Sequence, residues 1–183
     1  NRKGVACFYL GKVDDALQCF EQVLQNKPND IDSLGWKGQL LFQQLKDKEA
    51  VECFKKIHRI DPKNVSALRW IGVIYKTTHK YEKALECYDK TIKIDNKNWG
   101  PINQKGIILR LLHNYQDALQ CFNQMLEMKV EGKCPNCGNK HASGKLQAIN
   151  SKGVTFGVLG DNRKALEYFE QALKISPNHL GVL

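Results

Sequence analysis

One helical segment recurs along the chain at a fixed spacing, and this repeat restricts the fold more than any other feature. In residues 80–95, KYEKALECYDKTIKID, a small, an aromatic and an aliphatic residue follow each other at i, i+4 and i+8, on one face of a helix. The matching alanines of the first four copies are 34 residues apart: Ala16, Ala50, Ala84 and Ala118. Ala165 follows after 47 residues, which indicates an insertion of 13 residues. Such a period predicts a solenoid of stacked repeats.

Each repeat is predicted to contain two helices. The second helices are expected to begin near Asp14, Asp47, Glu82, Gln116 and Asn162, and prolines end three of them, at Pro28, Pro62 and Pro177. The first helix of every repeat contains one glycine: Gly4, Gly38, Gly72, Gly106 and Gly153. Because glycine costs about 1 kcal/mol in a helix relative to alanine, this column predicts a close approach of the neighbouring helix, with the alanines facing the glycines.

These columns resemble the tetratricopeptide repeat family. The third repeat carries the family pattern at Leu68, Gly72, Tyr75, Ala84 and Tyr88, and the fifth carries it at Gly153, Phe156, Ala165, Phe169, Ala172 and Pro177. The resemblance covers the chain except for about residues 130–145. It implies an all-α fold: a single α-solenoid, a right-handed superhelix of about five helix-turn-helix repeats over 1–183. The expected repeats are about 1–30, 31–64, 65–98, 99–129 and 146–179.

The charges and cysteines restrict the class of protein further. The chain has 28 basic and 19 acidic residues, a formal net charge of +9, but acids lie among the lysines, and a solvated basic surface is favoured over a nucleic-acid or membrane surface. Residues 1–183 contain no apolar run of membrane-spanning length and no signal-peptide pattern, and since they begin at Asn1 a preceding targeting segment stays open. Four of the seven cysteines share one repeat column, where free cysteine serves as a small buried residue: Cys19, Cys53, Cys87 and Cys121. This column favours a reducing, cytoplasmic location.

No phosphate-binding loop or nucleophile motif occurs, so the chain is not expected to be an enzyme. The family resemblance implies instead a scaffold that binds a peptide or partner protein in a concave groove lined by the first helices. Transferred by column, the groove residues are Phe8, Tyr9, Trp36, Gln39, Phe42, Arg69, Trp70, Val73, Lys76, Asn103, Ile107, Arg110, Asn150 and Val154. The partner itself cannot be named from these residues. The chain stops at HLGVL, which would open a sixth repeat, so an excerpt of a longer array or stacking of an exposed end on a partner is expected.

Two features of this groove have competing interpretations. Trp36 and Trp70 are one period apart and would either face the groove or pack between adjacent repeats. Arg69, Lys76 and Arg110 add positive charge, which suits a peptide with apolar anchors and a carboxylate. The alternative function is a nucleic-acid-binding helical repeat, in which tryptophans stack on bases and lysines contact phosphates. A steep fall of affinity with salt would distinguish the alternative.

The inserted segment, residues 130–145, VEGKCPNCGNKHASGK, predicts a structural zinc site. Cys134 and Cys137 are separated by two residues and His141 follows, a Cys-x2-Cys-x3-His spacing that lets both sulfurs reach one ion. The segment is too short and polar to order itself by burial, and metal coordination would order it.

A structural zinc ion takes four protein ligands, and the insertion supplies three. His179, at the end of the next second helix, is the predicted fourth ligand, ahead of Glu131, a water molecule or a residue of another chain. A redox-active dithiol and a metal-free loop are the other interpretations. The sequence Gly138-Asn139 after the second cysteine disfavours the dithiol, which normally begins a helix.

Overall fold

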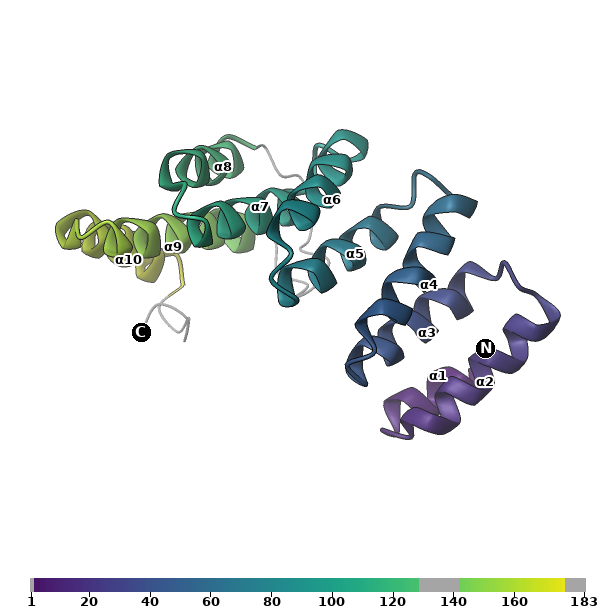
Figure 1. Cartoon of the computed structure of the whole chain (residues 1–183). Coiled ribbons are helices and arrows are strands. Elements are labelled where there is room, and N and C mark those ends of the chain that lie inside the picture. Colours follow the sequence, from purple (N-terminus) through teal and green to yellow (C-terminus); the bar gives the residue numbers. More distant parts are fainter. Residues whose placement is uncertain (1, 129–141, 177–183) are drawn as a thin grey trace. The chain divides into compact units, whose positions relative to one another are not determined.

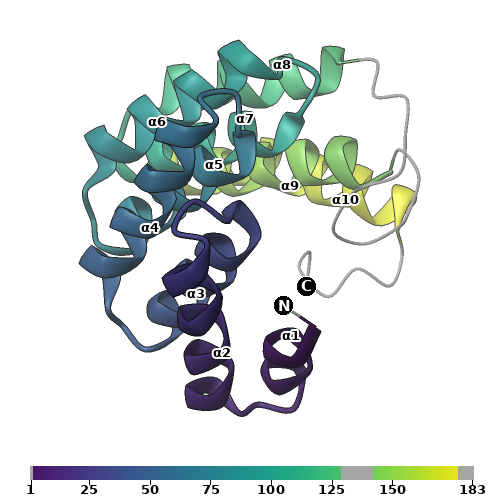
Figure 2. The same ribbon diagram turned by 90° about the vertical axis from the view of Figure 1, so that its right-hand side faces the viewer.

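The chain is all-helical in the part that the structure, a computed structural model, describes: residues 2–128 and 142–176. It divides into two compact units, Asn1–Ile94 and Asp95–Leu183. The helices of the first unit are α1 (Arg2–Tyr9), α2 (Val13–Asn26), α3 (Ile31–Gln43), α4 (Asp47–Ile60), α5 (Val65–Thr77) and α6 (Tyr81–Ile94). Those of the second unit are α7 (Trp99–Leu111), α8 (Tyr115–Glu127), α9 (Ala142–Val158) and α10 (Asn162–Ile175). Within each unit every helix packs against the next one (Figure 1 and Figure 2).

The predicted helix boundaries are confirmed at the second helices, which all begin within one residue of the expected positions. The first helices α3 and α5 begin at a polar residue of one repeat column, whose side chain caps the helix. Asp30 accepts a hydrogen bond of 2.8 Å from the Ser33 N–H, and Asn64 accepts one of 3.0 Å from the Ala67 N–H. Such a cap satisfies a backbone donor that has no partner within the helix.

Helix α9 begins earlier than expected. It starts at Ala142, inside the segment 130–145 that was predicted to be inserted loop. The added turn packs on α7, because a Cβ placed on Gly144 would lie 3.1 Å from the indole ring of Trp99. Contact with this tryptophan therefore extends the helix beyond the repeat pattern.

The two helices of each repeat join at one residue with left-handed backbone geometry. The φ angles are 71° at Gly11, 60° at Leu45, 57° at His79, 61° at His113 and 81° at Gly160. At each turn the next N–H bonds back to a carbonyl five residues earlier, as from Lys46 to Leu41 at 2.9 Å. This is the Schellman arrangement, in which glycine is favoured because it has no Cβ to clash with the following carbonyl.

The turn at Leu45 predicts a stabilising substitution. Leu45→Gly should raise the free energy of unfolding by about 0.5–1 kcal/mol, because it removes the cost of a left-handed non-glycine residue and the side chain is 84% exposed. Gln18→Gly, at an exposed site inside α2, should lower it by about 1 kcal/mol. Urea denaturation measures both. A lower midpoint for Leu45→Gly than for the unmodified chain would contradict this account of the turn.

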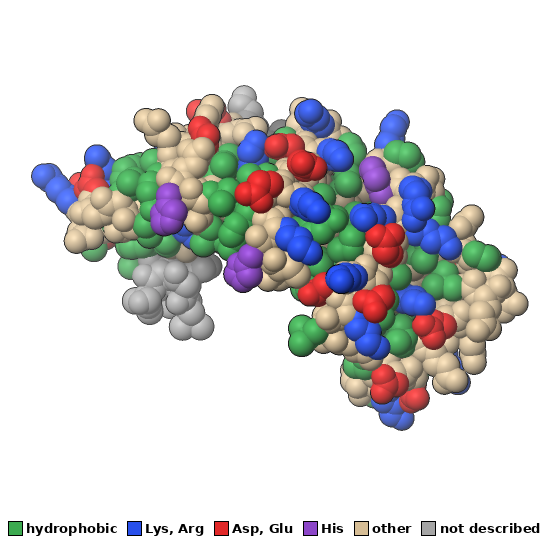
Figure 3. Space-filling view, viewed as in Figure 1, with side chains coloured by type: hydrophobic (Ala, Val, Ile, Leu, Met, Phe, Trp, Pro, Cys, Tyr) green, Lys and Arg blue, Asp and Glu red, His purple; other side chains and the backbone are tan. Residues whose placement is uncertain are grey.

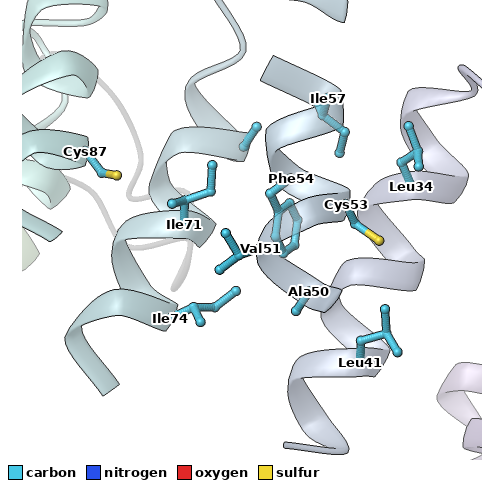
Figure 4. Close-up of a cluster of buried hydrophobic side chains, with 11 residues drawn as sticks. Leu34, Leu41, Ala50, Val51, Cys53, Phe54, Ile57, Ile71, Ile74 and Cys87 are labelled. Atoms are coloured by element: carbon cyan, nitrogen blue, oxygen red, sulfur yellow. The ribbon is translucent and has the colours of Figure 1, made fainter. Parts of the chain in front are cut away.

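The glycine column is a site of close helix contact, as predicted, but the residue that faces it is different. A Cβ on Gly38 would lie 2.8 Å from the ring of Phe54, and one on Gly106 would lie 2.6 Å from the ring of Phe122. The aromatic ring four residues after the repeat alanine therefore covers each glycine, and the alanines themselves lie buried beside it. Figure 4 shows Phe54 and Val51 of α4 between Leu41 of α3 and Ile74 of α5.

The cysteine column belongs to the same contact. Cys53, Cys87 and Cys121 are buried and Cys19 is half-buried, and none of these four cysteines forms a disulfide. Burial raises the pKa of Cys53, and it raises the pKa of Cys87 to about 11, so these thiols stay protonated and unreactive. The predicted role as small core residues is confirmed for the three buried ones. The cytoplasmic location stays a prediction.

Two glycines of α3 provide a matched test of the close contact. Gly38→Ala should lower the free energy of unfolding by about 1–2 kcal/mol, since overpacking against Phe54 outweighs the helix preference of alanine. The Phe54 ring cannot withdraw freely because it stacks on Trp70 at 5.7 Å. Gly35→Ala should raise stability by up to about 1 kcal/mol, because its Cβ would meet only Ile57 at 3.9 Å. Denaturation midpoints in the opposite order would refute the assignment of the contact.

Candidate binding surface

Two aromatic triads, one period apart, join the repeats of the first unit. Trp36 of α3 lies parallel to Phe20 of α2, with ring centroids 6.0 Å apart and planes at 5°, and 4.9 Å from Phe8 of α1. Trp70 repeats the arrangement with Phe54 at 5.7 Å and 6°, and with Phe42 at 6.2 Å. Both tryptophans therefore pack between adjacent repeats, which confirms the packing interpretation. Both remain only half-buried, so part of each ring also reaches the surface.

Exposed and charged residues surround these rings on α1, α3 and α5. We call the predicted groove residues of these helices the first-helix face: Phe8, Tyr9, Trp36, Gln39, Phe42, Arg69, Trp70, Val73 and Lys76. Tyr9 is 76% exposed beside Phe8, and the exposed Arg69 holds its guanidinium 6.0 Å from the ring of Trp70. Lys76 takes the position that Phe42 has one repeat earlier, and partial burial lowers the pKa of its ammonium group. The face thus carries aromatic surface with cations at one end.

The predicted groove residues of the second unit are less accessible. Asn103 is only 5% exposed and its Oδ1 lies 3.4 Å from the Ser151 hydroxyl of α9, so it belongs to the interior between α7 and α9. Ile107 and Val154 are half-buried. Arg110 is also half-buried, and burial lowers the pKa of its guanidinium. Asn150 is half-buried, and its Oδ1 finds no hydrogen-bond partner among the described groups.

Two clefts between the second helices of the first unit were not predicted. The first, about 540 Å³, lies between α2 and α3–α4 and is lined by three lysines and three glutamates: Lys37, Lys46, Lys48, Glu21, Glu49 and Glu52. The second, about 260 Å³, lies between α4 and α5–α6 and is lined by four lysines and two carboxylates: Lys48, Lys55, Lys80, Lys83, Asp47 and Glu52. Figure 3 shows basic and acidic side chains interleaved over α2, α4 and α6. A comparison of the charges in each repeat column would have revealed that lysines predominate in the second cleft.

The predicted zinc ligands Cys134, Cys137, His141 and His179 all lie outside the described residues. Within residues 2–128 and 142–176, no three His, Cys, Asp or Glu side chains gather in a way that could hold a metal ion. None of the helices in those ranges has the length and apolar character needed to cross a membrane. The paired helices and their glycine–aromatic contacts define a helical-repeat protein.

Comparisons with known proteins agree with this class. Residues 6–105 match a family model described as Psidin, N-terminal TPR repeats region, and residues 146–179 match one described as Tetratricopeptide repeat. Because the first match covers more than half of the chain, the chain belongs to this family of tetratricopeptide repeat proteins. The comparison with curated protein sequences gives no match.

Several solved structures have the same fold. MamA has a TM-score of 0.77 at 18% identity, covering 95% of this chain and 94% of its own. YrrB, described as a TPR protein with an unusual peptide-binding site, has a TM-score of 0.70 at 19% identity and coverage of 98% and 86%. TTC0263 of Thermus thermophilus, described as a thermophilic TPR protein, has a TM-score of 0.67 at 19% identity and coverage of 99% and 92%. At such identities the likeness establishes the fold only.

Proposed function

We propose that the chain is a protein-interaction scaffold that binds a peptide or a partner protein through the first-helix face of its first unit. The observation that carries this proposal is the combination of exposed Tyr9, the half-buried rings of Trp36 and Trp70, and the cationic Arg69 on one set of helices. Aromatic and arginine side chains dominate the binding energy of protein interfaces because they offer a large apolar area together with a polar group.

The structure of the face indicates what kind of ligand it would accept. The parallel stacking on Phe20 and Phe54 fixes the tryptophan rings, so binding would cost little side-chain entropy. Apolar side chains of a ligand would contact the exposed parts of these rings, and a carboxylate would reach Arg69 and Lys76. The peptide-binding site in the description of YrrB, a protein of the same fold, supports this use of the helices. No reaction is assigned to the chain.

Pull-down with the immobilised full chain from nuclease-treated cell extract tests the proposal. Tyr9→Ala and Arg69→Glu should each reduce recovery of a specific partner about tenfold, which corresponds to loss of an interface residue worth about 1.4 kcal/mol. Lys90→Glu, which makes the same charge change as Arg69→Glu at an exposed site on α6, should leave recovery unchanged. Undiminished recovery with both face variants would refute the proposal. Partners that are recovered from untreated extract and lost from nuclease-treated extract would instead favour the nucleic-acid alternative.

We also propose a structural zinc site at Cys134, Cys137 and His141, with His179 as the fourth ligand. The support comes from the sequence alone: the Cys-x2-Cys-x3-His spacing and a segment with little apolar content. The ligands stand outside the cysteine column of the repeats, whose members are core residues. Metal coordination would therefore be the reason for cysteines at these two positions.

Elemental analysis of protein purified without chelator tests the zinc proposal. About one zinc ion per chain is expected, with loss of the metal in Cys134→Ser. Cys19→Ser provides a matched control, because this cysteine belongs to the packing column and should not affect metal content. A trace of zinc that Cys134→Ser leaves unchanged would eliminate the site. Full zinc content in His179→Ala would show that a group other than His179 is the fourth ligand.

A further inference from the structure

The second cleft of the first unit, which we call the basic cleft, has a charge pattern that neither neighbouring repeat shares. Four of its lining positions are lysine: Lys48, Lys55, Lys80 and Lys83. One repeat earlier the same columns read Asp14, Glu21, Lys46 and Glu49. One repeat later they read Glu82, Asp89, Asn114 and Asp117. Three of the four columns, those of Lys48, Lys55 and Lys83, are therefore basic here and acidic in the repeats on both sides.

Folding does not require these lysines. The preceding repeat builds a corresponding cleft, between α2 and α3–α4, and two of the four columns line it as acids, Glu21 and Glu49. That first cleft is balanced in charge, and one of its pairs, Lys37 Nζ to Glu21, forms an ion pair of 2.8 Å. Clustered lysines repel one another and disfavour the compact state. Since folding does not require the repulsion between these lysines, their presence indicates that the cleft binds a ligand.

The basic cleft retains an excess of positive charge after its internal pairs are formed. Lys55 donates a hydrogen bond of 2.8 Å to Glu52, which occupies one of the two carboxylates. In the described part of the chain Lys48, Lys80 and Lys83 form no ion pair, and Lys83 lies 5.9 Å from the ring of Tyr75. Figure 3 shows several basic side chains close together between α4 and α6. Three lysines therefore remain available to an anionic ligand.

The wall of the cleft adds an apolar component. Val51 is 6% exposed and Ile74 is 1% exposed, and the half-buried ring of Tyr75 lies beside them. At about 260 Å³ the cleft accommodates one or two side chains rather than a large ligand. Val51 and Ile74 close the bottom, and the lysines stand around the rim. This combination suits a ligand that carries apolar and anionic groups close together.

We infer that the basic cleft binds an acidic segment of a polypeptide, with an apolar side chain against Tyr75 and carboxylates near Lys48, Lys80 and Lys83. A nucleic acid fits less well, because the acidic columns of the flanking repeats, Asp14 and Glu82 among them, would interrupt a phosphate path. The cleft shares no residue with the first-helix face. It is a second binding surface, and the inference holds whether or not the first-helix face binds a peptide.

Fluorescence anisotropy with the full chain tests this inference. The probe is a labelled octapeptide of aspartate and glutamate with one central leucine, at physiological ionic strength. Lys80→Glu should raise its Kd about tenfold, the effect of losing one charge-assisted contact. Lys46→Glu is the matched control: it makes the same charge change in the same repeat column, in the first cleft, and should change Kd less than about twofold. Glutamate is favourable near a helix N-terminus, so both variants should fold.

The remaining outcomes are decisive. Equal weakening by Lys80→Glu and Lys46→Glu would reveal attraction to net charge alone and overturn the inference. Tight binding of a probe with glutamine and asparagine in place of the acids would also overturn it, as would stronger binding of an oligonucleotide or of inorganic phosphate. Weakening by Arg69→Glu but not by Lys80→Glu would place the probe on the first-helix face and overturn the inference for the basic cleft.

Discussion

The contact between a glycine of the first helix and an aromatic ring of the second is the interaction on which the rest of the structure depends. A Cβ on the glycine would lie between 2.6 and 2.9 Å from the ring in all five repeats, so no other residue fits without a shift. The ring in turn is almost fully buried at Phe20, Phe54, Tyr88 and Phe122, and each such burial contributes about 1.5–3 kcal/mol. Trp36 and Trp70 then stack on the rings of Phe20 and Phe54. One ring therefore serves both the packing within a repeat and the packing to the next.

Sequence columns identified where the second helices begin, because local chemistry determines these positions. Proline, the capping Asp30 and Asn64, and the left-handed turn residues act within a few residues of the boundary they set. The facing residue of the glycine was assigned wrongly because a column does not show where a side chain points. In a helix the side chain leans toward the N-terminus, over the preceding turn. The Phe54 ring thus lies over the preceding turn of α4, and the ring rather than Ala50 contacts Gly38.

Two other differences come from contacts between distant segments, which periodicity cannot reveal. Helix α9 begins at Ala142 because its first turn packs on Trp99, 43 positions earlier in the chain than Ala142. Asn103 stands in a column that indicates a surface position, yet it lies in the interior beside Ser151. Both cases involve α9, the helix that follows the insertion. After the insertion, residues of one repeat column no longer pack against the same neighbours as in the other repeats. The repeat pattern therefore does not predict their contacts.

In a repeat protein, some repeat columns serve folding and other columns serve recognition of a ligand. The columns that form the contact between the two helices of a repeat keep the same chemistry in every copy, as the glycine column and the aromatic column do. Columns that face solvent wholly or in part can change, since a substitution there leaves this contact intact. Departures from the period are therefore where a binding surface is built. The position of Trp36 and Trp70 becomes Gln104 in the next copy, and Phe8 and Phe42 give way to Lys76. The four lysines beside α4 are a departure of the same kind, and the packing beneath them, Val51 against Ile74, remains that of Leu17 against Leu40 one repeat earlier.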